Sequence, residues 1–339
     1  MSVRAGMRSP LLGGLVMVAI WAAARPTASG SSVPAQAQRP EVVSHAPDSA
    51  IAYEWFTYVP RSLRPGERAL IWVTGLHGNL VTDRYDSIAI ESRDMAERRV
   101  ALAEERRLAM LVPVIPRPRT NYVYAVALAP RVFLAESEEF VRRPDLRLNA
   151  MIDRFAAELR AGGFVVDERV LLDGFSAGAM FAQRYALLHP RRVLAIAAGQ
   201  CGGALTLPES TLEGATGARL DWPAGVGDFE RLAGYAFDRD AYRRIAQFVY
   251  IGDQDTSNST LVRTRELWRT QEQIDLLNRV FGRTDPARIE AQSRYLTRRG
   301  YNVTFRAYPG VGHTTTRAMR DDVFAFFDSV RTATAGARH

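Results

Sequence analysis

Apolar and polar residues alternate in blocks along the chain from residue 51 onward, with short β-rich blocks separated by longer amphipathic ones. The β-rich blocks predict strands at 51–59, 69–74, 110–115, 169–173, 193–198, 248–251 and 303–308. Helical spacing predicts helices at 87–108, 177–188 and 315–330, and two more between the last two strands. This alternation is typical of an α/β fold with a mostly parallel central sheet and helices on both faces.

One further helix is predicted because five apolar side chains fall on a single helical face: Leu148, Met151, Ile152, Phe155 and Leu159. Asp145 stands just before them and is expected to cap the first turn. The stretch 202–240 has little periodicity and is predicted to be an insertion before the strand at 248–251. We therefore expect one domain over residues 51–332, a disordered lead-in at 38–50 and a tail at 333–339.

The first 37 residues have the pattern of an export signal. Arg4 and Arg8 precede the uninterrupted apolar run 11–24, and the small-x-small sequence Ala35-Gln36-Ala37 follows a polar stretch. The alternative is a retained membrane anchor, but the apolar run is about six residues shorter than a comfortable span. We expect cleavage after Ala37, a secreted or periplasmic protein, and no stable membrane association after cleavage.

The net charge of +7 does not indicate a nucleic-acid partner, because the 44 basic residues are all arginine and are scattered along the chain. Cys201 is the single cysteine, so an internal disulfide and a thiolate metal cluster are excluded. The sequence has neither metal-ligand spacing of histidines or acids nor a nucleotide-binding loop. No metal and no cofactor are expected.

The pentapeptide Gly174-Phe175-Ser176-Ala177-Gly178 is the strongest chemical signal. It lies between the predicted strand 169–173 and the predicted helix 177–188, which is the setting of a nucleophile elbow. The glycines let strand and helix approach closely around a strained serine. The turn then directs the Ser176 hydroxyl to the carboxyl edge of the sheet, so Ser176 is the candidate nucleophile.

A serine nucleophile needs a base, and only five histidines exist. His45 lies in the lead-in, His339 ends the chain, His77 precedes a glycine after a strand, and His189 suits a cap or packing role at a helix end. His313 remains. It follows the predicted strand 303–308 in a glycine-rich loop, the place expected for the base in chain order Ser, Asp, His.

The base needs a carboxylate to orient it, and two aspartates follow the strand 248–251. We prefer Asp255, because a turn of a few residues is needed to bend a carboxylate toward His313. Asp253 is the alternative, and its other interpretation is a turn former that bonds to its own backbone.

Two backbone amides are expected to bind the oxyanion that such a reaction forms. One is the amide of Ala177, directly after the nucleophile. The second is expected from the loop after strand 69–74, with Asn79 the first choice and Gly78 the second. His77 would then support this loop.

These blocks together resemble the α/β-hydrolase superfamily, and within it the secreted poly(3-hydroxybutyrate) depolymerase-like and feruloyl-esterase-like enzymes. The resemblance rests on short blocks between residues 51 and 330, at 58–60, 76–78, 166–170, 174–178, 189–190, 252–255 and 312–313. Many secreted members of that group carry disulfides, which this chain cannot form internally. The resemblance implies a secreted esterase that acts on a small or polymeric ester.

From the residues alone we expect a serine hydrolase that cleaves carboxylic esters. A peptidase or acyltransferase with the same residues, and a non-catalytic binding protein on this scaffold, remain the alternatives. The insertion 202–240 contains Trp222, Phe229 and Tyr235. Their side chains are expected either to wall an acyl or aromatic pocket or to pack beneath the insertion.

Overall fold

The structure is a computed structural model. It describes residues 41–76, 80–119, 127–135, 137, 139–212, 217–256 and 270–336. The expected export signal at 1–37 lies outside these residues, so its cleavage and the localisation that follows from it stay predictions. Pro40–His339 form one compact unit that contains all of the described residues.

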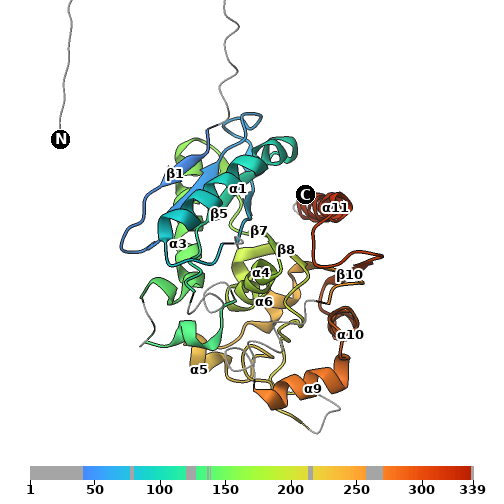
Figure 1. Ribbon diagram of the computed structural model, residues 1–339. Coiled ribbons are helices and arrows are strands. Elements are labelled where there is room, and N and C mark those ends of the chain that lie inside the picture. The colour runs from blue at the N-terminus through green and yellow to red at the C-terminus, as the bar shows by residue number, and fades with distance from the viewer. Residues whose placement is uncertain are drawn as a thin grey trace, which may run out of the picture. The chain divides into compact units, whose positions relative to one another are not determined.

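The centre of this unit is a sheet of eight strands in the order β1-β2-β5-β4-β7-β8-β9-β10, with β1 and β10 at its two edges (Figure 1). Its strands are β1 (Val43–His45), β2 (Trp55–Tyr58), β5 (Ala109–Pro113), β4 (Ile71–Val73), β7 (Val170–Phe175), β8 (Val193–Gly199), β9 (Ala246–Gly252) and β10 (Val303–Tyr308). The pairs β1–β2 and β2–β5 are antiparallel, and all other neighbours are parallel. The predicted mostly parallel sheet is therefore confirmed. A separate pair, β3 (Arg68–Ala69) and β6 (Val165–Val166), is also parallel.

The helices that accompany the sheet are α1 (Tyr85–Arg106), α3 (Pro144–Ala161), α4 (Ala177–Leu188), α5 (Phe229–Ala233), α6 (Arg239–Arg243), α9 (Gln271–Phe281), α10 (Asp285–Arg298) and α11 (Arg317–Gly336). Three 3₁₀ turns, η1 (Pro130–Phe133), η2 (Glu139–Val141) and η3 (Pro190–Arg192), lie in the connections. Within the described part of the chain, no helix is both long and apolar enough to cross a membrane.

The helices cover both faces of the sheet, as two consecutive residues of β7 demonstrate. Neighbouring side chains of a strand point to opposite faces. A Cβ at Gly174 would meet the backbone of Gly178 in α4, whereas the Asp173 carboxylate interacts with Arg99 of α1. Helix α11 packs on the same face as α1, because Arg106 lies over the ring of Phe324.

The strands in the middle of the sheet are largely buried, which explains their mostly apolar sequence pattern. All residues of β8 and of β9 are buried, as expected for parallel strands with helices on both faces. Cys201 follows β8 and is fully buried, with its Sγ 3.9 Å from the amide oxygen of Gln183. The core is therefore formed by apolar packing between the sheet and its helices.

The prediction of a disordered lead-in at 38–50 is wrong in part, because Val43–His45 form strand β1 on the edge of the sheet. The imidazole of His45 stacks on the indole of Trp55 with ring centroids 3.8 Å apart, and its Nε2 lies 2.8 Å from Thr57 Oγ1. Val42 is also buried. The polar composition of this segment gave no sign of a strand, because the strand is stabilised by contacts with β2.

The prediction that Asp145 caps helix α3 is also wrong. Helix α3 begins after Arg143 without a side-chain cap, and the Asp145 carboxylate is buried. It accepts hydrogen bonds from Arg143 Nε (2.9 Å) and lies 2.9 Å from His189 Nε2. Asp145 therefore joins the start of α3 to the end of α4. At the other end of the chain, α11 continues to Gly336, so the first part of the expected tail is helical.

Strand β1 provides a test of the edge of the sheet. A chain that begins at Ala46 loses β1 and the cover over Trp55. We expect its free energy of unfolding to be about 2–4 kcal/mol lower than that of a chain beginning at Gln38, since the deletion removes buried apolar surface and a short ladder. Urea unfolding followed by tryptophan fluorescence measures the difference. Equal midpoints for the two chains would mean that β1 contributes nothing to stability.

Candidate active site

Ser176 occupies a sharp turn between β7 and α4. Its backbone has φ 55° and ψ −121°, a conformation that is strained for a residue with a side chain. A Cβ at Gly174 would lie 2.2 Å from the carbonyl oxygen of Gly178, so only glycine fits where strand and helix cross. The sequence therefore folds into an elbow at this position because Gly174 permits the approach.

Hydrogen bonds on both sides fix the backbone of Ser176. Its N–H donates to the carbonyl of Gly199 at the end of β8 (2.8 Å), and its own carbonyl accepts from the N–H groups of Ala179 and Met180. The residue is half-buried, so its hydroxyl is accessible at the carboxyl edge of the sheet.

His313 lies in the loop between β10 and α11 and reaches both candidate partners. Its Nε2 is 3.0 Å from Ser176 Oγ, and its Nδ1 is 2.9 Å from Asp255 Oδ2. The Asp255 side chain is only 2% exposed, whereas that of His313 is 33% exposed. The ring of Phe175 lies against the imidazole, with centroids 5.1 Å apart. The structure thus brings together three side chains that the sequence analysis singled out.

Asp253, the alternative carboxylate, has a different contact. Its Oδ1 accepts a hydrogen bond from the N–H of Gly310 (2.8 Å), and its side chain is exposed. Two backbone bonds run beside it, from the N–H of Asp253 to the Tyr308 carbonyl and from the N–H of Gln254 to the Val311 carbonyl, both 3.0 Å. Asp253 therefore helps to join the loop after β9 to the loop after β10.

The two loops also come together because of a glycine at the end of β9. A Cβ at Gly252 would lie 2.0 Å from the carbonyl oxygen of Val311. Any side chain there would push the histidine loop away from the loop that carries Asp255. This close approach therefore contributes to the position of His313.

The structure describes one of the expected oxyanion donors. Ala177 is the first residue of α4, and the first amides of a helix have no acceptor within that helix. The positive end of the helix dipole also lies there. Gly78, Asn79 and His77 lie outside the described residues, so the second donor stays a prediction.

The aromatic residues of the insertion form a packed cluster. Trp222 donates from Nε1 to the Leu128 carbonyl (2.7 Å) and is buried, as is Phe229, whose ring packs edge-on against Trp222 and Tyr235. The Tyr235 hydroxyl donates to the carbonyl of Leu188, the last residue of α4. Ser176 precedes the other end of this helix, about 18 Å away at 1.5 Å per residue. Tyr235 therefore lies outside the immediate surroundings of Ser176, and a pocket wall formed by Trp222 and Phe229 stays a prediction.

A buried ion pair that the sequence analysis missed lies in the electrostatic surroundings of the site. Asp285 begins α10 and is 2.8 Å from the guanidinium of Arg288. Burial raises the pKa of the Asp285 carboxyl above its ordinary value although Arg288 opposes the shift, and the charge of Asp255 raises it further. The only sequence signal was an aspartate at a helix start, which is common at such positions.

No group of three histidine, cysteine, aspartate or glutamate side chains among the described residues is arranged to hold a metal ion. Two of the histidines that the sequence analysis did not choose as the base pack against other residues. His45 stacks on Trp55, and His189 directly follows α4 and lies beside Asp145.

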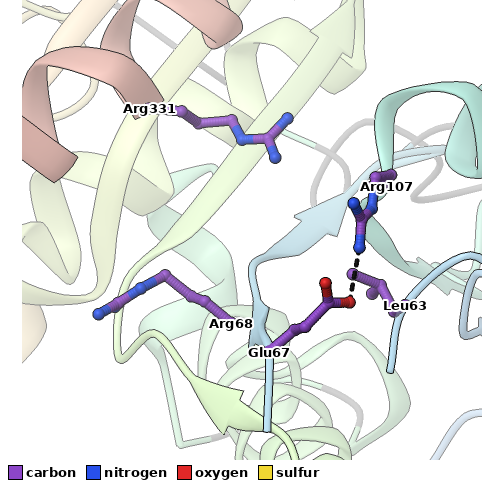
Figure 2. Close-up of a pocket in the computed structure, with 5 residues that line it drawn as sticks. All are labelled: Leu63, Glu67, Arg68, Arg107 and Arg331. Carbon is purple, nitrogen blue, oxygen red and sulfur yellow. Dashed lines mark hydrogen bonds and ion pairs between the residues drawn. The ribbon is translucent and has the colours of Figure 1, made fainter. Parts of the chain in front are cut away.

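A cavity of about 370 Å³ lies elsewhere on the molecule, lined by Leu63, Glu67, Arg68, Arg107 and Arg331 (Figure 2). Figure 2 shows Arg107 paired with Glu67, and Arg68 extending away from them. Arg68 and Arg331 also have carboxylate partners, Asp167 and Asp328. Since Arg68 begins β3 and Arg107 precedes β5, the cavity lies at the amino end of these strands, whereas Ser176 follows the carboxyl end of β7.

No family model matches the sequence, and no curated protein sequence matches it. Among solved structures, poly(aspartic acid) hydrolase-1 from Sphingomonas sp. KT-1 is 17% identical, aligns with 85% of this chain and 98% of that one, and gives a TM-score of 0.56. The poly(3-hydroxybutyrate) depolymerase LpqC from Bordetella parapertussis is 20% identical over 85% and 89% of the two chains, with a TM-score of 0.51.

At this identity the likeness concerns the fold alone. The eight-stranded, mostly parallel sheet, the helices on both faces and these two structural neighbours agree with each other. The expected resemblance is confirmed at that level: this chain has the α/β-hydrolase fold.

Proposed function

We propose that the protein is an exported serine hydrolase that cleaves carboxylic esters through an acyl-enzyme. The observation that carries the proposal is the hydrogen-bonded chain from Ser176 Oγ through His313 to Asp255, with atom separations of 3.0 Å and 2.9 Å. These separations are within the range that proton transfer between a nucleophile and its base requires. The strained backbone of Ser176 supports the same conclusion.

In the first half of the reaction, Ser176 Oγ attacks the ester carbonyl carbon while His313 Nε2 takes the hydroxyl proton. Asp255 accepts the Nδ1–H of His313, which fixes the tautomer and stabilises the imidazolium that forms. The negative charge moves to the carbonyl oxygen, where the Ala177 amide and an amide of Gly78 or Asn79 would stabilise it. His313 then gives its proton to the leaving alcohol, and the acyl group stays on Ser176.

In the second half, a water molecule replaces the alcohol. His313 takes a proton from the water as its oxygen attacks the acyl carbon, and returns that proton to Ser176 Oγ as the carboxylic acid leaves. The partial exposure of Ser176 and His313 is consistent with access of water to the reacting atoms.

The substrate class follows from what the fold and its neighbours support together. The two structural neighbours are named as a poly(aspartic acid) hydrolase and a poly(3-hydroxybutyrate) depolymerase; the first polymer is joined by amide bonds and the second by ester bonds. An ester is the more reactive of the two toward a serine nucleophile, because its alcohol is a better leaving group than an amine. We infer a small or polymeric ester as substrate. Export is inferred from Arg4, Arg8, the apolar run 11–24 and the small residues at 35–37.

The first test is ester hydrolysis with and without the serine. The protein beginning at Gln38 is expected to hydrolyse p-nitrophenyl acetate, butyrate or octanoate, and Ser176→Ala is expected to lower kcat about 10⁴–10⁶-fold because the nucleophile is gone. Equal rates for the two proteins would show that Ser176 is not the nucleophile. Activity on peptide anilides, or acyl transfer to an added alcohol in preference to water, would instead favour a peptidase or an acyltransferase.

A matched pair of isosteric substitutions tests which aspartate orients the base. Asp255→Asn is expected to lower kcat about 10³–10⁴-fold, because an amide does not hold the reactive histidine tautomer. Asp253→Asn keeps an oxygen that accepts the Gly310 N–H, so its kcat should stay within about threefold of the wild-type value. Steady-state kinetics on the same ester measures both, and a larger loss in Asp253→Asn would reverse the assignment.

A further inference from the structure

We infer that Gln200 is a positioning residue for His313, an inference that rests on the proposed function of Ser176 and His313. Gln200 directly follows β8 and is 1% exposed. Its side-chain Nε2 donates a 2.7 Å hydrogen bond to the carbonyl of Gly312, the residue before His313. The amide of Gln200 therefore acts on the backbone that carries the imidazole.

The end of β8 contacts both halves of the reacting pair. The Gly199 carbonyl accepts the N–H of Ser176, and the next residue, Gln200, bonds to the loop of His313. Strand β8 lies between β7 and β9 in the sheet, so its carboxyl end stands between the nucleophile and the loop of Asp255. Two consecutive residues thus set the position of the serine and of the histidine against one common strand.

The other hydrogen bonds of the loop that carries His313 connect it to a different part of the structure. The bonds of Asp253 and Gln254 join this loop to the loop after β9, and so fix His313 relative to Asp255. The bond from Gln200 instead fixes the loop relative to β8 and, through Gly199, relative to Ser176. The distance between Ser176 Oγ and His313 Nε2 depends on this second connection.

Gln200 occupies its position at a cost that packing alone does not explain. Its φ is +49°, a left-handed conformation that is unfavourable for a residue with a side chain. Its Oε1 is buried and, among the described residues, has no hydrogen-bond partner. Strain and an unpaired polar atom persist where a function retains them.

The experiment replaces the amide while keeping its length. In Gln200→Met the donor to Gly312 is lost, and we expect kcat for p-nitrophenyl butyrate and the rate of Ser176 labelling by a fluorophosphonate to fall about 10–100-fold. KM should stay within about twofold, because the substrate still meets the same surface. A displaced imidazole affects the reaction step in both assays.

Gln292→Met is the matched control. Gln292 is also fully buried, and its amide bonds to the N–H and the carbonyl of Leu205, which is not part of the histidine loop. Its substitution removes buried hydrogen bonds of the same kind. We expect its Tm to fall at least as far as that of Gln200→Met while its kcat and labelling rate stay within about twofold of wild type.

A second variant adds a measurement, the pH dependence of the labelling rate, that a loss of side-chain packing would not change. In Gln200→Glu, the protonated carboxyl group can donate its O–H to Gly312, whereas the carboxylate cannot. The labelling rate of this variant divided by that of wild type at the same pH should therefore rise toward one as the pH falls. A ratio that stays well below one at every pH, the lowest included, would overturn the positioning role.

The outcomes separate this inference from the function on which it rests. Labelling of the wild type but not of Ser176→Ala, together with an unchanged labelling rate in Gln200→Met, would overturn the role of Gln200 and leave the proposed function standing. A wild type that is not labelled would overturn both. A selective loss in Gln200→Met, with Gln292→Met active, supports both.

Discussion

The imidazole of His313 must reach a serine 137 residues earlier and a carboxylate 58 residues earlier in the chain. This requirement is met because β7, β8, β9 and β10 are neighbours with the same direction, so their carboxyl ends lie along one edge of the sheet. Gly174 and Gly252 then allow backbone approaches that no side chain would permit. The geometry at Ser176 depends on these two close approaches, although neither glycine takes part in proton transfer.

Much of this arrangement could be predicted from the sequence, because its signals are local. The helix predicted at 177–188 has the same bounds as α4, and the strand predicted at 303–308 has the same bounds as β10. An apolar run that ends in glycine marks the carboxyl end of a buried strand. Ser176 and Asp255 each follow such a run, and His313 follows the partly exposed edge strand β10 in a glycine-rich loop, so residue type and chain order were sufficient to single the three out.

The features that could not be predicted depend on contacts between segments far apart in the chain. Asp145 resembled a helix cap and is instead bonded to His189, 44 residues away. Strand β1 had a polar composition, and its place on the sheet follows from His45 and its partners on β2. Gln200 belongs to no motif. Its amide matters because of the carbonyl 112 residues later that accepts its hydrogen bond.

The burial of Cys201 has a consequence for a protein that is made in one redox environment and, as we propose, works in another. The only thiol of the chain is enclosed between β8 and α4 and is fully covered. Oxidants and disulfide-exchange enzymes therefore find no accessible sulfur on the folded surface. The thiol chemistry of the folded domain would therefore be the same before and after the proposed export, and no disulfide within the chain would add to its stability.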